Sequence, residues 1–110
     1  MYGNINTTIG FSALSSALVT ILPANTGDVV LSLPGARKAT DIVTAIQVDP
    51  DVAFDIGYAD LVSAWVSADD QITLRYYNLV PNTTSLNIAA GTEFKGKVER
   101  CDNGFKADGL

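Results

Sequence analysis

The sequence predicts an all-β protein, built as an antiparallel β-sandwich or jelly-roll-like domain. Short runs rich in Val, Ile, Thr and aromatic residues alternate with a period of two, and Gly, Pro, Asn and Asp separate them at close spacing. No long stretch carries the 3.6-residue period of a helix with proper helix ends. About six to eight short strands without long helices bury their apolar faces most simply as two stacked sheets.

The N-terminal part of the chain gives one clear expectation and one with two alternatives. Residues 1–10 are polar and rich in Asn and Thr, so we expect an extended N-terminal arm without a core of its own. In residues 11–22 Ser and Thr are frequent, and Ala17–Leu22 fits a strand that ends at Pro23. A helix is the alternative, with one face formed by Phe11, Leu14, Leu18 and Leu22. We favour an extended segment with a short helix close behind it.

Two strands are expected in the next part of the chain. Asn25–Asp28 has the composition of a turn, Val29–Leu33 that of a strand, and Pro34-Gly35 ends it, because proline lacks the N–H that a ladder needs. Ile42–Val48 is apolar on both faces, as in a strand that is buried on two sides or lies at an interface. Asp49-Pro50-Asp51 ends that strand, and Val52–Ile56 suits a short further one.

The clearest element is a β-hairpin. Leu61–Ser67 and Gln71–Asn78 are two β-prone runs around Ala68-Asp69-Asp70. In the second run Ile72, Leu74 and Tyr76 alternate with polar or aromatic neighbours. We expect Trp65 and Tyr76 to lie in the core, Tyr77 to be partly exposed, and the aspartate corner to be an ordinary exposed turn.

The last third of the chain completes the domain. Residues 81–85 suit a polar loop, Leu86–Ile88 a weak strand, and Ala90-Gly91 a turn. Glu93–Arg100 alternates charged residues with Phe94, Gly96 and Val98, so one face is expected in water. The domain division is therefore an arm at 1–10, a β-sandwich domain at 11–100 and a flexible C-terminal tail at 101–110.

Composition excludes several classes of function. The formal net charge is −5, and direct nucleic-acid binding normally needs a basic patch. No run of about 18 apolar residues exists to span a membrane. Cys101 is the only cysteine, so the chain forms no intramolecular disulfide. No Lys or Arg precedes Arg37, so we expect no secretion signal.

The residues offer little for catalysis. The chain has no histidine, which removes Ser-His-Asp and Cys-His catalysis and most zinc sites. Asp69-Asp70 and a second acidic cluster suit turns better than a calcium site or a carboxylate pair, since no calcium-loop spacing is present; the second cluster is Asp49, Asp51, Asp55 and Asp60. We predict no catalytic, cofactor-binding or metal-binding residue, and a chain that is not an enzyme.

Two weaker patterns have a functional and a structural interpretation. A stacking platform for a sugar or a single strand would use four aromatic residues, Tyr58, Trp65, Tyr76 and Tyr77. Arg37-Lys38 beside a glycine would suit a phosphate-binding nest. We favour core packing for Trp65 and Tyr76, partial exposure for Tyr77, and a solvated loop for the basic pair.

Two stretches resemble small virion proteins of tailed bacteriophages. In the first, Asp28–Ala36 (DVVLSLPGA) is followed by Thr40–Val43 (TDIV): a strand, a Pro-Gly-Ala turn, and Thr-Asp-x-Val opening the next strand. In the second, Ala64–Asn78 (AWVSADDQITLRYYN) leads to a Thr-rich loop and a last strand that ends in Arg100. The likeness covers about residues 24–100. It departs at Val48–Asp60, which is more acidic and aromatic.

The resemblance implies a capsid decoration (cement) protein or a head-fibre protein. Such proteins are typically β-sandwich or jelly-roll homotrimers without a cofactor, made in the host cytoplasm and placed on the outer capsid surface. The implied partners are the major capsid protein and further copies of the chain, and not nucleic acid or a membrane. One alternative is a tail-fibre or spike tip that binds a host receptor or glycan. Another is a cytosolic binding module, such as a carbohydrate-binding sandwich.

Overall fold

The described structure consists of β-strands. The computed structural model describes residues 5–48, 59–79 and 85–102, and this part of the chain contains no helix, hence none that could cross a membrane. The strands are β1 (Ile5–Leu14), β2 (Val19–Ile21), β3 (Thr26–Ser32), β4 (Asp41–Val48), β5 (Ala59–Ala68), β6 (Gln71–Asn78), β7 (Leu86–Ile88) and β8 (Glu93–Asp102). The all-β prediction is confirmed. The expected strand at Val52–Ile56 lies outside the described residues.

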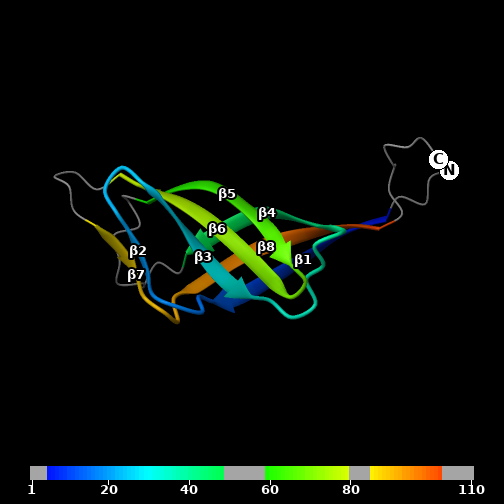
Figure 1. Cartoon of the computed structure of the whole chain (residues 1–110). Helices are drawn as coiled ribbons and strands as arrows, with labels where there is room; N and C mark the ends of the chain where they lie inside the picture. The colour runs from blue at the N-terminus through cyan, green and yellow to red at the C-terminus, as the bar shows by residue number, and fades with distance from the viewer. Residues whose placement is uncertain (1–4, 49–58, 80–84, 103–110) are drawn as a thin grey trace.

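The strands form three antiparallel sheets. Two are three-stranded, in the orders β1-β8-β4 and β3-β6-β5, and the third is the pair β2-β7. Figure 1 shows β1 and β8 running side by side to one end of the molecule, with β2 and β7 at the opposite end. Apart from the β5–β6 hairpin, the paired strands are far apart in the sequence, and local pattern does not assign those pairings.

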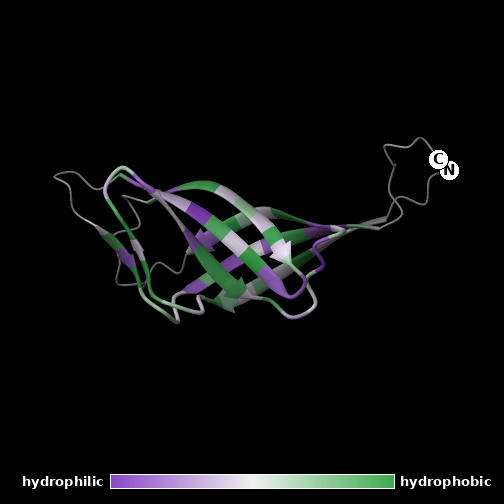
Figure 2. Ribbon diagram, in the orientation of Figure 1, coloured by the Kyte–Doolittle hydropathy of each residue, from purple (hydrophilic) through white to green (hydrophobic). Residues whose placement is uncertain are grey.

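One core cluster receives side chains from all three sheets. The alternation behind it is visible in Figure 2 as hydrophobic and hydrophilic bands along β6 and β8. On β6 the buried residues include Ile72, Leu74 and Tyr76, and on β8 they include Phe94 and Val98. The Tyr76 and Phe94 rings lie with their centroids 6.3 Å apart, and burial raises the pKa of the Tyr76 phenol to about 12. The expected inward set of the hairpin's second strand is therefore correct.

Residues 11–22 are not helical: β1 ends at Leu14, bends follow at Ser16 and Ala17, and β2 begins at Val19. The short helix expected behind this segment is wrong for the described chain. Burial follows a period of two at the end of β1, where Ala13 and Ser15 are buried. The residues that would have formed a helical face stay largely in water: Leu14, Leu18 and Leu22 are more than half exposed. Ser15 lies inside because its hydroxyl accepts a hydrogen bond from the Thr92 N–H at 3.0 Å and donates one to the Ala89 carbonyl at 2.9 Å.

Several expected boundaries move. β1 begins at Ile5, inside the predicted arm, and β8 continues to Asp102, inside the predicted tail. The turn expected at 25–28 is also displaced, because β3 already begins at Thr26. The turn lies earlier, with the Asn25 N–H donating to the Leu22 carbonyl. Gly27 is a strand residue, and a Cβ there would meet Ile21 Cγ1 at 2.6 Å, so close packing accounts for that glycine.

The hairpin of β5 and β6 is confirmed, but the predicted core position of Trp65 is wrong. Trp65 pairs with Thr73, and its neighbour Val66 pairs with the fully buried Ile72. Opposite residues of paired strands share a face. Val66 therefore points into the core and Trp65 points to the outer face. β5 has two register shifts, between Leu61 and Ser63 and between Val66 and Ala68. Such bulges interrupt the alternation of inward and outward side chains along a strand, so simple alternation misplaces Trp65.

The strand β4 is not buried on two sides. Its Ile42 side chain is 57% exposed, and Ala45 and Gln47 are exposed too. β4 is an outer strand, hydrogen-bonded only to β8 among the described strands. The apolar outer face that suggested double burial thus remains available to another molecule.

Two glycines make a matched test of packing. A Cβ on Gly96 would collide with the Ala45 carbonyl oxygen and lie 2.8 Å from Phe11 ring carbons, whereas a Cβ on Gly10 would meet only one atom, at 4.0 Å. Gly96→Ala should therefore lower the free energy of unfolding by about 1–3 kcal/mol, as overpacking does, while Gly10→Ala should change it little. Urea denaturation of both variants measures this, and equal losses would contradict the described Phe11–Gly96 contact.

Candidate functional site

The loop Leu33–Lys38, between β3 and β4, is held by the turn of the β5–β6 hairpin. The Leu33 N–H donates to the Asp70 carbonyl at 2.9 Å, and the Asp70 N–H donates to the Ala36 carbonyl at 2.8 Å. Gly35 and Asp70 adopt left-handed backbone angles, with φ of 94° and 65°. The aspartate corner is an exposed turn, as predicted, and it also supports the neighbouring loop.

A charged pair closes one end of this loop. The Arg100 guanidinium donates two hydrogen bonds of 2.9 Å to the Asp41 carboxylate and one of 2.7 Å to the Gly35 carbonyl. The Asp41 side chain is 1% exposed and that of Arg100 is 20% exposed. The hydrogen bonds from Arg100 outweigh burial, and the Arg37 N–H and Thr40 hydroxyl assist them, so the pKa of Asp41 falls from 3.8 to about 2.

Three backbone N–H groups of the loop Leu33–Lys38 bind the chain's own carboxylates. The Gly35 N–H donates to Asp70, the Arg37 N–H to Asp41 and the Lys38 N–H to Asp69, over 2.8 to 3.0 Å. Each donor meets a different carboxylate, so these N–H groups do not converge on one anion as the donors of a phosphate-binding nest do. The Arg37 and Lys38 side chains are exposed, as in the favoured solvated loop, while their N–H groups fasten the loop.

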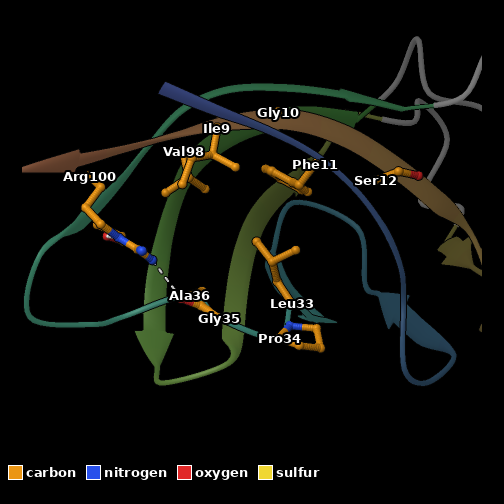
Figure 3. Close-up of a pocket in the computed structure, with 11 residues that line it drawn as sticks. Ile9, Gly10, Phe11, Ser12, Leu33, Pro34, Gly35, Ala36, Val98 and Arg100 are labelled. Atoms are coloured by element: carbon orange, nitrogen blue, oxygen red, sulfur yellow. Dashed lines mark hydrogen bonds and ion pairs between the residues drawn. The ribbon is translucent and has the colours of Figure 1, made fainter. Parts of the chain in front are cut away.

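Beside the Arg100–Asp41 pair lies a hollow of about 370 Å³, which we call the Arg100 hollow. Its walls come from β1, from the loop after β3 and from β8, and its lining residues are Ile9, Gly10, Phe11, Ser12, Leu33, Pro34, Gly35, Ala36, Asp41, Val98 and Arg100. In Figure 3 Ile9, Phe11 and Val98 lie on one side and Leu33 and Pro34 on the other. The wall is largely apolar, and its ion pair is already matched, so it suits an uncharged apolar group.

The amino-acid pattern contains only a partial signal for this site. Arg100 falls on the apolar face of the last strand, which marks a charge that must find a partner inside. Its partner Asp41 is 59 residues away in the chain, and nothing in the local pattern joins the two. The hollow itself arises only where β1 and the loop after β3 meet in space.

The aromatic platform, the alternative that was not favoured, is not assembled from these four residues within the described ranges. Tyr76 is buried, and Tyr58 lies outside the described residues. Trp65 and Tyr77 are half-buried, and the Arg75 guanidinium lies 5.1 Å from the centre of the Trp65 ring. Arg75 also binds Asp28 at 2.8 Å, and this hydrogen-bonded contact lowers the pKa of Asp28. On the outer face of the hairpin, the Arg75 guanidinium therefore covers the Trp65 ring.

A substitution of Trp65 tests that placement. Trp65→Ala should lower the free energy of unfolding by less than the 3–5 kcal/mol that is typical of a fully buried aromatic residue, because the indole leaves the outer face and not the core. Urea denaturation measures the loss. A loss as large as that of Phe94→Ala would return Trp65 to the core and overturn the described register of β5.

The remaining predicted candidates bring no chemistry together within the described ranges. Asp49, Asp51 and Asp55 fall outside them, and Asp60 is exposed on β5. No three His, Cys, Asp or Glu side chains gather there as metal ligands. Cys101 is a half-buried free thiol on β8, and its N–H donates to the Thr40 carbonyl.

Comparison of the chain with protein-family models, curated proteins and solved structures finds no match.

Proposed function

We propose that this chain is a capsid decoration (cement) protein of a tailed bacteriophage, which bridges neighbouring major capsid subunits on the outer surface of the head. The observation that carries the proposal is β1, an outer strand of ten residues without a charged side chain, left open on one side among the described strands. An open, uncharged strand edge is a surface for binding another protein. The resemblance of residues 24–100 to virion proteins of tailed bacteriophages indicates that the bound partner is a phage capsid.

The rest of the described molecule supports a binding role. Its most buried ion pair and its loop N–H groups are used to fasten loops to sheets. Large aliphatic side chains stay exposed on the outer strands, among them Ile42, Leu61 and Val62, and these suit contacts between subunits. In this proposal the two three-stranded sheets are the layers of a β-sandwich or jelly-roll-like domain, the chain is a homotrimer, and it is not an enzyme.

Heating of intact particles tests the role. Particles that carry the protein and particles that lack it are warmed, and DNA release is followed with a dye that cannot enter closed heads. Bridges between subunits should hold the head against the pressure of packaged DNA, so bare particles should release DNA at a lower temperature. Adding the purified chain back should restore the higher temperature. Identical release temperatures would refute the proposal.

A receptor-binding or glycan-binding tip of a tail fibre or spike is the second candidate. The observation that favours it is the outward position of Trp65 and Tyr77, since aromatic rings on an outer sheet face can stack on sugars. Copy number separates the two functions, because a decoration protein is present in hundreds of copies per particle and a tip in tens or fewer. A glycan array probed with the wild-type chain and Trp65→Ala gives the second distinction: glycan binding that Trp65→Ala abolishes would favour the tip.

A further inference from the structure

The four outer strands of the two three-stranded sheets differ in how well their edges are protected. β4 has one register shift and β5 has two, and such bulges discourage the addition of a further strand. β3 carries Asp28, and its edge is capped near Val30, whose carbonyl accepts hydrogen bonds from the Ser16 N–H and hydroxyl. β1 has no charge, no proline and an unbroken register of ten pairs with β8. Of these four outer strands, β1 alone lacks all these protections.

The register fixes which backbone groups of β1 face away from β8. The Ser15 N–H donates to the Thr92 carbonyl, one step beyond the last β1–β8 pair. Hydrogen-bonded pairs alternate along an antiparallel ladder, so the odd-numbered residues of β1 bond to β8. The even-numbered residues, including Thr8, Gly10 and Ser12, direct their N–H and C=O groups to the open edge. Ser16 confirms the direction, because its N–H reaches across to β3.

The open edge of β1 borders the Arg100 hollow. β1 and β3 are joined at the Ser15–Leu31 bridge, and from there toward Ile9 the hollow lies between β1 and the loop after β3. Gly10 and Ser12 line it together with the side chains of Ile9 and Phe11 (Figure 3). Gly10 has no packing requirement inside the chain, since a Cβ there would meet nothing closer than 4.0 Å. A glycine in a strand interior often marks the close approach of another backbone.

We propose that an extended, uncharged segment of another protein adds to β1 as a further strand, hydrogen-bonded to Thr8, Gly10 and Ser12, and places an apolar side chain in the Arg100 hollow. The open N–H and C=O groups of β1 bind an extended backbone, and the apolar wall of the hollow favours an apolar side chain on that backbone. Residues of the added strand opposite Ile9 or Phe11 share their inward face and so enter the hollow. A charged residue is disfavoured there, because Asp41 and Arg100 already satisfy each other.

A single segment fits this site better than a second copy of the whole chain. Two copies paired antiparallel through β1 form one continuous sheet with the same faces on the same side. Each copy would then bring its own loop after β3 toward the loop of the other, above the shared strands. A lone strand carries no such loop. The site deepens the proposed capsid role, since both rest on the open edge of β1, but the edge recognises strand backbone and an apolar side chain in whichever protein supplies them.

A library of random ten-residue peptides on an array is the probe, applied to the full-length chain. Wild-type protein should select uncharged peptides with apolar residues at alternate positions. Gly10→Pro removes only an N–H on the open edge and places the proline ring there, leaving the β1–β8 hydrogen bonds in place. Binding of the selected peptides should fall at least tenfold. Ser63→Lys, an exposed change on β5, is the matched control and should bind as wild type. Gly10→Lys replaces Gly10→Pro if the proline variant fails to fold.

The backbone amides give an independent readout. On binding of a selected peptide, hydrogen exchange should slow at Thr8, Gly10 and Ser12, while Ile9 and Phe11, already bonded to β8, should change little. Failure to select any peptide, equal binding by Gly10→Pro or Gly10→Lys, or slowing confined to other strands would each overturn the strand site. Concentration-dependent dimerisation that Gly10→Pro abolishes would also overturn it, in favour of a second copy on β1. None of these outcomes bears on whether particles lacking the protein release DNA early.

Discussion

Arg100→Leu is expected to lower the free energy of unfolding by about 3–5 kcal/mol, the usual loss when one partner of a buried ion pair is removed. The Asp41 carboxylate is 1% exposed, and both of its oxygens accept hydrogen bonds from Arg100. Without the guanidinium a buried negative charge has lost its counter-ion, and the Gly35 carbonyl loses a donor. Urea denaturation followed by far-ultraviolet circular dichroism measures the change.

Arg75→Leu is the matched control for that variant. Arg75 also makes two hydrogen bonds to a carboxylate, that of Asp28, but the two side chains are 43% and 40% exposed. Water screens such a pair, so its removal should cost much less than the loss of Arg100. Similar losses for both variants would show that burial of Asp41 does not set the strength of the Arg100 pair.

The same pair gives the protein a defined acid sensitivity. The pKa of Asp41 is lowered from 3.8 to about 2 in the folded chain. A lowered pKa stabilises the fold above pH 3.8, and the contribution, about 2 kcal/mol, disappears as the pH falls toward 2. Asp41→Asn should flatten the fall in stability between pH 4 and pH 2, as seen in urea midpoints at several pH values. An unchanged slope in that variant would assign the acid sensitivity to other carboxylates.

Phe94→Ala is expected to have an equally large effect, about 3–5 kcal/mol, because it empties a large volume in a close-packed core. Phe94 is fully buried on β8, packs beside Tyr76 of the opposite sheet and belongs to the single core cluster. The loss appears as a lower urea midpoint with an unchanged slope.

Leu14→Ala is the control for the core substitution. Leu14 is 56% exposed on β1 and pairs with Glu93, the residue before Phe94. Its replacement should change the free energy of unfolding by no more than about 0.5 kcal/mol, as is usual for surface positions. A large loss for Leu14→Ala beside a small one for Phe94→Ala would mean that β1 and β8 face the other way.

The local pattern predicted those parts of the fold that depend on local chemistry. A period of two and the turn residues account for the β5–β6 hairpin, for the inward set Ile72, Leu74 and Tyr76, and for the solvent-exposed face of β8. They also place the end of β3 close to its observed position at Ser32, shortly before Pro34-Gly35. Trp65 was misplaced because the bulges of β5 shift the register, and bulges leave little trace in a single sequence.

The candidate site could not be predicted from the local pattern for a different reason, because its residues are far apart in the chain. Arg100 and Asp41 are 59 residues apart, and the Gly35 and Lys38 N–H groups of the loop after β3 bind Asp70 and Asp69 of the β5–β6 hairpin. Each residue alone has an ordinary explanation as a strand-end charge or a turn aspartate. The fastened loop, the buried ion pair and the hollow form only where these residues meet in the tertiary structure.

The sequence by itself determined that this chain is made of strands, because alternation and turn chemistry act over a few neighbouring residues. It also determined that β1 is uncharged. Only the tertiary structure decided that β1 is an outer strand, that its open edge borders an apolar hollow, and that Asp41 and Arg100 meet beside it. Those features depend on which distant strands pair, and strand pairing is decided by burial of the whole core, which no local pattern encodes.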